Sequence, residues 1–220
     1  MNARIIQRAS RRVKSPIYVP PEGLSSLRIL AESGFEAFRS EVERLFHLGS
    51  PWAAALLGHL HLTTEAGGAP KAIEVCRAAA NGGSAYAQYV LAWALAYAED
   101  NQKQALHYLR LASLQNFTPA TVDLAQFVFR GMGTTAPGPR AAVRILRIAI
   151  KRGHRGAPAR ILYIYRKKGP GLARKILGYV LAPIAAVWYL ASIYANPFDE
   201  NVYLLVRRLG HPFVPSKGKG

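Results

Sequence analysis

The stretch that decides the fold is KAIEVCRAAANGGSAYAQYVLA, residues 71–92. Its first half places apolar residues at helical spacing, and its second half carries small residues where two helices must approach closely. Between the halves lies Gly82-Gly83, and paired glycines in a helical pattern indicate a turn. The stretch therefore predicts two helices joined by a short connection.

Three further segments superimpose on this one, so the chain contains an internal repeat. An arginine recurs in register at intervals of 33, 33 and 37 residues, and an alanine at intervals of 34, 33 and 37. Both series lengthen at the same place, which a four-residue insertion in the loop 131–138 explains. The members are Arg44, Arg77, Arg110 and Arg147, and Ala53, Ala87, Ala120 and Ala157.

Each unit is predicted to contain two helices with a shared core. In one second helix the apolar positions are Val143, Leu146 and Ile150. The second helix of each unit is followed by a break of small or polar residues, at Gly49-Ser50, Gly82-Gly83, Asn116 or Gly153. The first helix of the next unit has an apolar residue four positions after its register alanine: Leu57, Leu91, Leu124 or Ile161. A single helix pair cannot bury its own apolar face, so we expect stacked neighbours to share one core.

These residues resemble the Sel1-like repeat, a relative of the tetratricopeptide repeat. The resemblance is sharp in one unit and extends as a pattern over residues 35–166. It implies an all-α solenoid of about four helix pairs and an adaptor that assembles protein complexes, without an active site. The matching positions are Lys71, Ala72, Ala78, Ala79, Gly82, Ala85, Ala87, Gln88, Tyr89, Leu91 and Ala92.

Register alignment gives the chemically reactive residues structural positions. Cys76 takes the place of Leu109 and Leu146, so we expect a small core residue rather than a nucleophile. His59 and His61 are two apart on a predicted helix and face different directions, which does not suit a shared metal ion. The chain also lacks a glycine-rich phosphate loop and the common hydrolase motifs. We therefore expect no enzyme, no cofactor, no metal and no small-molecule substrate.

The net charge of +17 is distributed unevenly. Residues 22–101 hold five basic and nine acidic side chains, whereas residues 139–175 hold twelve basic and no acidic ones. Such a block favours an anionic partner, either phospholipid headgroups or, as the alternative, nucleic acid. The candidate anion-binding residues are Arg140, Arg144, Arg147, Lys151, Arg152, Arg155, Arg166, Lys167 and Lys168.

Residues 176–195, ILGYVLAPIAAVWYLASIYA, form an uncharged apolar run. As one helix it would extend about 30 Å, the thickness of the bilayer hydrocarbon core, so it is a candidate transmembrane helix. The basic residues before it would lie on the cytoplasmic side. The alternative is a fifth solenoid unit, in which Pro183 divides two helices and residues 199–210 form the closing helix.

The N-terminal segment 1–21 holds five basic and no acidic side chains. This composition resembles a mitochondrial presequence, but the interpretation we favour is a basic tail that ends in prolines.

The predicted organisation has four parts. They are a basic, proline-containing segment (1–34), the solenoid (35–168), the apolar segment (169–195), and a short helix with a basic tail (196–220). We expect a non-enzymatic scaffold whose groove holds another protein or peptide, at the cytoplasmic side of a bacterial inner membrane; a cytoplasmic or mitochondrial location is the alternative. The candidate groove residues, all on first helices, are Trp52, His59, Tyr86, Trp93, Gln126 and Arg130.

Overall fold

The computed structural model describes residues 25, 26, 29, 32–98, 101–133, 138–168 and 171–195. Within these residues the chain forms helices and no strand. The predicted N-terminal segment 1–34 lies mostly outside this part, and residues 196–220 lie outside it entirely. The helices are α3 (Phe35–His47), α4 (Pro51–Thr64), α5 (Ala69–Asn81), α6 (Ala85–Ala98), α7 (Gln102–Leu114), α8 (Thr118–Arg130), α9 (Pro139–Lys151), α10 (Ala157–Lys168) and α11 (Leu172–Ala195).

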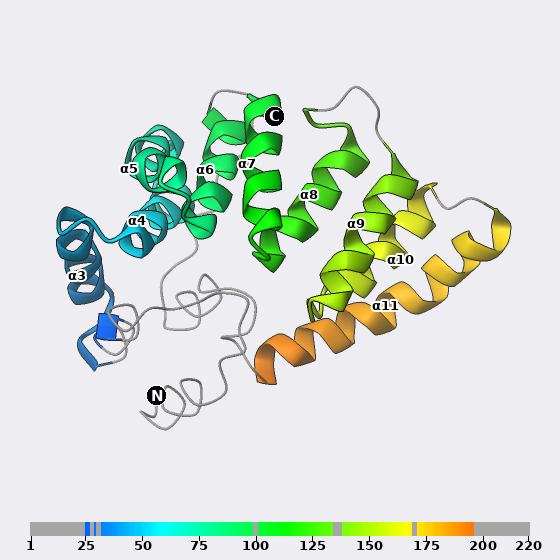
Figure 1. Ribbon diagram of the computed structural model, residues 1–220. Coiled ribbons are helices and arrows are strands. Elements are labelled where there is room, and N and C mark those ends of the chain that lie inside the picture. The colour runs from blue at the N-terminus through cyan, green and yellow to red at the C-terminus, as the bar shows by residue number, and fades with distance from the viewer. Residues whose placement is uncertain are drawn as a thin grey trace.

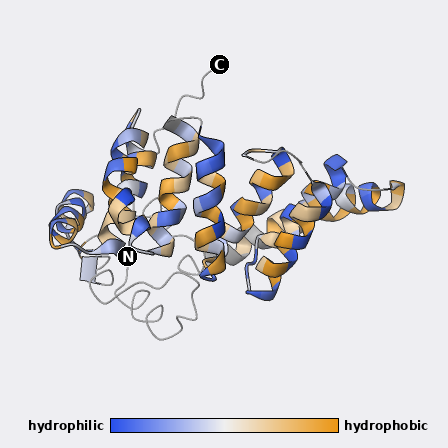
Figure 2. Ribbon diagram, turned by 45° about the horizontal axis from the view of Figure 1, so that its top comes forward, coloured by the Kyte–Doolittle hydropathy of each residue, from blue (hydrophilic) through white to orange (hydrophobic). Residues whose placement is uncertain are grey.

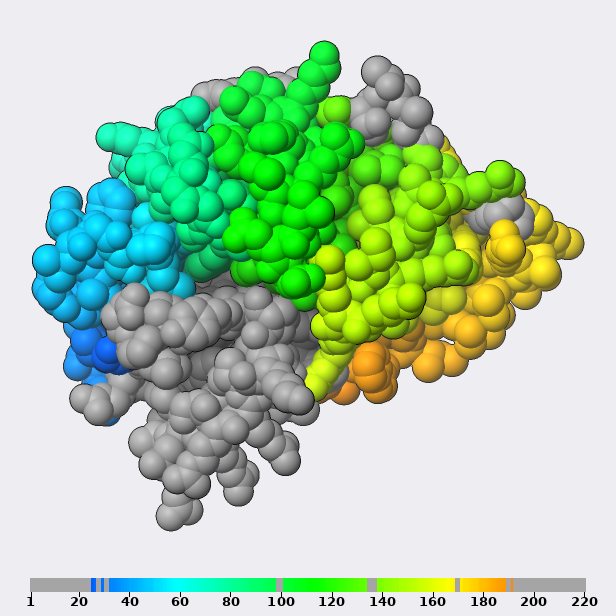
Figure 3. All heavy atoms as spheres, in the orientation of Figure 1, coloured from blue at the N-terminus to red at the C-terminus, as the bar shows by residue number. Residues whose placement is uncertain are grey.

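The helices form an α-solenoid in which each helix packs against the next one in sequence. Helices α4, α6, α8 and α10 are the first helices of the repeats, and α3, α5, α7, α9 and α11 are second helices. They stand in a curved row from α3 to α9, with α10 and α11 at the far end (Figure 1). The space-filling view shows the described helices as one continuous body (Figure 3). This confirms the predicted all-α solenoid.

The connection from each second helix to the next first helix has one repeated geometry. Gly49, Gly83, Asn116 and Gly153 each lie four residues before a register alanine and have positive φ angles of 84°, 94°, 64° and 86°. The amide of the following residue reaches back to close the turn; for example, Ser84 N–H donates to the Ala79 carbonyl at 3.0 Å. Glycine and asparagine tolerate this left-handed conformation best, which explains the predicted breaks.

Local signals begin several helices. Ser50 Oγ accepts a hydrogen bond from Ala53 N–H at 3.3 Å at the start of α4, and Asn101 Oδ1 accepts one from Gln104 N–H at 3.2 Å at the start of α7. Both caps satisfy an amide that has no partner within the helix. Proline lies in the first turn of α4, α5, α8 and α9, where its missing N–H costs no helical hydrogen bond.

Most helices carry one hydrophobic and one hydrophilic band, and the hydrophobic bands meet in the core (Figure 2). Cys76 is fully buried there, as predicted, and burial raises the pKa of its thiol to about 12. Leu57, Leu91 and Leu124 are buried as predicted. Of the three apolar positions predicted for α9, Val143 and Leu146 are buried, but Ile150 is 40% exposed. The prediction that Ile150 belongs to the shared core was therefore wrong. The buried face of α9 runs through Ala149, and Ile150 lies one position beyond it.

Helix α11 is a single helix that continues through Pro183 and packs against α10. The division into two helices at Pro183, which belonged to the alternative of a fifth solenoid unit, was therefore wrong, and α11 instead takes the second-helix position beside α10. The two helices approach closely at Gly178, where a Cβ atom would lie 2.6 Å from the amide nitrogen of Arg166. The proposed closing helix 199–210 lies outside the described residues.

No helix in the described part of the chain is long and apolar enough to cross a membrane, so the predicted transmembrane helix is not found there. The structure describes the backbone of residues 189, 190 and 192–195 but not their side chains.

Candidate partner-binding groove

A cavity lies where three successive first helices, α6, α8 and α10, come together. It measures about 610 Å³ and is an open groove rather than an enclosed chamber. Helix α8 supplies the floor, α6 one wall, and α10 with the turn before it the other wall. A cavity of this size at the meeting point of several elements is the usual form of a binding site.

Asp123 is the polar centre of this groove. Its Oδ2 atom accepts hydrogen bonds from the Tyr89 hydroxyl at 2.9 Å and from the Trp93 indole N–H at 3.1 Å. These bonds join α6 to α8 and orient both aromatic rings along the wall. A carboxylate with two neutral donors on one oxygen remains a strong acceptor on its other oxygen.

Burial raises the pKa of the Asp123 carboxyl. The hydrogen bonds from Tyr89 and Trp93 and the positive charge of Arg160 favour the ionised form and oppose that increase. Burial, together with the adjacent Asp123 charge, also raises the pKa of Tyr89 well above its usual value, so its hydroxyl stays protonated and acts as a donor.

Two arginines lie at the opening of the groove. Arg160 donates to the Gln126 side-chain oxygen, a neutral partner, and Arg130 lines the same cavity. Neither forms an ion pair with another residue in the described part of the chain. With Asp123 ionised the groove carries one net positive charge, because His154 is neutral at pH 7: burial and the charge of Arg160 lower the pKa of His154 to about 4.

Four aromatic side chains line the groove: Tyr89, Trp93, Phe129 and Tyr163. Trp93 packs edge-on against Phe127 with ring centroids 5.6 Å apart, and Phe129 packs edge-on against Tyr163 at 6.2 Å. Such rings supply a large contact area at low entropic cost, which is why they are enriched in protein interfaces.

Three of the six predicted groove residues line this cavity: Trp93, Gln126 and Arg130. The other three do not. Trp52 is only 6% exposed, and Tyr86 is buried with its hydroxyl 3.3 Å from His59 Nδ1. They lie in the first units of the solenoid, in or beside the main core.

The sequence prediction missed Tyr89, Asp123, Arg160 and Tyr163. Tyr163 had a clear signal, because it lies six residues after its register alanine, as His59, Trp93 and Gln126 do. Asp123 and Arg160 also share one position, three residues after the alanine, where the earlier repeats have Leu56 and Val90. A change from apolar to charged at one repeat position was the signal for these two residues.

The predicted anion-binding residues have several different environments. Arg140, Arg144, Arg147 and Lys168 are exposed and line a second, smaller cavity, and Lys151 and Lys167 are exposed but do not line it. Arg152 is instead structural: it donates to the Ser113 carbonyl at 2.8 Å and to the Thr121 hydroxyl at 2.9 Å. Arg166 lies over the rings of Tyr163 and Tyr179, and Arg155 is half-buried.

No group of three or more histidine, cysteine, aspartate or glutamate side chains in the described residues is arranged to hold a metal ion.

Comparison with known proteins identifies which solved structures share this fold. No protein-family model matches the chain, and no curated protein matches it. Among solved structures, a Sel1 repeat protein from Oxalobacter formigenes superimposes with a TM-score of 0.52 and 21% identity, over 86% of each chain. A protective antigen present in uropathogenic Escherichia coli strains, described as displaying an SLR fold, superimposes with a TM-score of 0.56 and 19% identity over 87% of this chain and 41% of its own length.

The chain thus forms an α-solenoid with an open groove between α6, α8 and α10. More specifically, the chain has the fold of Sel1-like repeat proteins, as its sequence pattern predicted.

Proposed function

We propose that this protein is a non-enzymatic interaction scaffold that binds a segment of a partner protein in the groove between α6, α8 and α10. The observation that carries the proposal is the cavity itself, which combines aromatic walls with polar groups from three repeats. The fold shared with Sel1-like repeat proteins agrees with this role but does not identify a partner.

The charges of the groove favour an acidic partner segment. Arg130 and Arg160 outnumber Asp123, and guanidinium groups bind carboxylates through paired hydrogen bonds. Trp93 and Tyr163 offer apolar contact to a neighbouring side chain of the partner. We therefore propose a segment in which an apolar or aromatic residue adjoins one or more carboxylates.

Selection from a phage-displayed random peptide library tests this proposal. The full chain should enrich peptides that combine acidic with aromatic or aliphatic residues, and Arg130→Gln/Arg160→Gln should bind them at least tenfold more weakly. The matched control is Lys103→Gln/Arg110→Gln, which removes the same charge from the exposed side of α7 and should bind them like the unaltered protein. Equal weakening by both variants would show that only net charge matters, and a lack of enrichment would refute the groove as a peptide site.

We also propose that the scaffold works at the cytoplasmic side of a membrane as a peripheral protein. The observation that favours this is the exposed apolar surface of α11, beside the most basic part of the chain. In a cell fractionation, the full chain should sediment with membranes and be released by an alkaline carbonate wash. Recovery entirely in the supernatant before the wash would exclude membrane association.

A further inference from the structure

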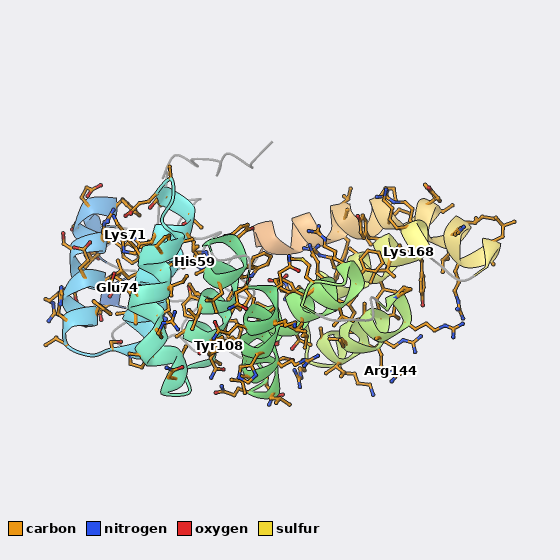
Figure 4. All side chains as sticks on the ribbon, turned by 90° about the horizontal axis from the view of Figure 1, so that it is seen from above. His59, Lys71, Glu74, Tyr108, Arg144 and Lys168 are labelled. Atoms are coloured by element: carbon orange, nitrogen blue, oxygen red, sulfur yellow. The ribbon has the colours of Figure 1, made fainter. Side chains whose placement is uncertain are left out.

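A second cavity, of about 240 Å³, lies between α9, α10 and the start of α11. Five of its lining side chains are basic, and they come from all three helices: Arg140, Arg144, Arg147, Lys168 and Arg174. Helical spacing puts the three α9 arginines on one face, and the packing of α10 and α11 brings the other two toward them. Arg144 and Lys168 lie at the same end of the molecule, opposite Lys71 and Glu74 (Figure 4).

The five side chains line the cavity together with no acidic residue. None of them forms an ion pair in the part of the chain that the structure describes, and no acidic residue occurs between Asp123 and Asp199 in the sequence. Arg174 lies over the Tyr165 ring at 5.9 Å, and Lys168 over the Phe129 ring at 6.0 Å. Like charges held together around one cavity repel one another, so an anion bound there would stabilise the arrangement.

The outer face of α11, which adjoins this basic cavity, is apolar. Only the side facing α10 is covered, whereas Ile184, Val187 and Trp188 are 64%, 68% and 55% exposed. Arg174, Leu177, Leu181, Ile184 and Trp188 follow one another at spacings of three and four residues. They therefore form a continuous stripe from the basic cavity onto the apolar face.

We propose that the basic cavity and the apolar face of α11 together bind the surface of an anionic phospholipid bilayer. The inference rests on the membrane association proposed above and names the surface responsible. Headgroup phosphates occupy the cavity, while α11 lies in the plane of the interface with its apolar face toward the acyl chains. A helix with this combination of basic and apolar surfaces is suited to lie on a bilayer.

The combination of charge and apolar surface favours a bilayer over the other candidates. Nucleic acid would use the arginines but leave the apolar face of α11 in water. A second copy that paired through α11 would cover that face but bring no carboxylate from its own α9–α11 to the basic cavity, because no acidic residue occurs between Asp123 and Asp199. Of these three candidates, the anionic bilayer is the one that satisfies both surfaces at once.

Vesicle flotation with the full chain tests the proposal, with phosphatidylcholine vesicles that contain or lack phosphatidylglycerol. The pocket variant is Arg144→Gln/Arg147→Gln, the face variant is Ile184→Gln/Val187→Gln, and the charge control is Lys103→Gln/Arg110→Gln. We expect the unaltered protein to float only with phosphatidylglycerol vesicles. The affinity of each of the first two variants for these vesicles should be at least tenfold lower than that of the unaltered protein, and the affinity of the control should be within about twofold of it. A tenfold change in affinity corresponds to about 1.4 kcal/mol.

Each alternative result has a defined meaning. If the protein binds both kinds of vesicle and neither the pocket variant nor the face variant weakens that binding, the proposed binding surface is refuted. Membrane association itself would still hold. Failure to bind any vesicle would overturn both. If inorganic phosphate or a DNA duplex binds the cavity while vesicles do not, the site serves a soluble anion or nucleic acid. If the face variant changes only the sedimentation coefficient, α11 is a contact between copies of the chain.

Discussion

Helices α3–α7 and helices α9–α11 share one repeat but differ in what they bury and expose. The N-terminal helices belong to a core cluster rich in large side chains, among them Phe38, Trp52 and Leu95. The cluster around α9 and α10 is smaller, with Leu146 and Ile164 as its largest members. One end of the solenoid therefore has a well-filled core, and the other leaves its last helix open on one side.

The charges differ in the same direction. In the N-terminal part, Glu65 accepts from Arg39, His61 and Lys71 at 2.8–2.9 Å and so links α3, α4 and α5. In the C-terminal part the five basic side chains around the smaller cavity form no ion pair with a carboxylate among the described residues. The same helix pair can thus serve as a self-contained building block or as a surface that a ligand completes, depending on which positions carry charge.

The largest expected effect is on the N-terminal core. A Cβ atom at Gly58 would collide with Cys76 Sγ at the crossing of α4 and α5. Gly58→Ala should therefore lower the free energy of unfolding by about 2–3 kcal/mol in urea denaturation, because overpacking forces the two helices apart.

Two further variants sharpen that measurement. Gly58→Ala/Cys76→Ala should recover part of the loss, since it removes the sulfur atom that the new methyl group meets. Gly82→Ala is the control, because its Cβ would meet only ordinary contacts at 3.4–3.5 Å. If Gly58→Ala were as stable as the unaltered protein, the crossing would not be tightly packed.

Acid should weaken both parts through two histidines, the half-buried His59 and the buried His154. Burial lowers the pKa of His59 and that of His154 to about 4, so the unfolded chain binds more protons than the folded one between pH 6.5 and 4. Stability is fully present above pH 6.5 and declines as the pH falls through that interval. Between pH 7 and pH 5 we expect a loss of about 1–2 kcal/mol for each histidine.

Urea denaturation at the two pH values tests this expectation. His154→Gln should remove its share of the pH dependence, whatever it does to stability at pH 7, whereas the exposed His107→Gln should leave the pH dependence intact. An unchanged slope for His154→Gln would show that His154 is protonated equally in the folded and unfolded chains.

A glycine substitution at the C-terminal crossing should have a smaller and more local effect. At Gly178 a new Cβ would meet the backbone of α10, 2.8 Å from the Leu162 carbonyl oxygen. Gly178→Ala should weaken the docking of α11 by about 1 kcal/mol and speed its hydrogen exchange, while α4–α7 exchange as before, because little of α11 is buried. Ala186→Ser, on the exposed side of α11, is the control; faster exchange throughout the chain would contradict the local effect.

The sequence predicted the fold well where one residue type has one physical role. Left-handed turns at Gly83 and Asn116, and the buried position of Cys76, follow from residue type and register alone. The groove was predicted only in part, because Tyr89 and Asp123 meet across two repeats, and that contact depends on how the units stack. The length of α11 was ambiguous because a proline can end a helix or lie within it.

The smallest effect concerns Glu65. Burial opposes the ionisation of this carboxyl, but hydrogen bonds from Lys71, His61 and Arg39 outweigh it and lower its pKa to about 2. Its contribution is present above pH 4.5 and is lost as the pH falls toward 2. Glu65→Gln should cost about 0.5–1 kcal/mol at pH 7, because the ion pairs are partly exposed.

Salt separates the two ends of the molecule most directly. Raising the ionic strength screens the attraction around Glu65 but also the mutual repulsion of the arginines on α9. Hydrogen exchange should therefore become faster in α3–α5 and slower in α9–α11 of the same sample, and Glu65→Gln should abolish the first response only. A shift in the same direction at both ends would mean that the charges of the C-terminal end are already balanced, and would remove the main reason for expecting an anion there.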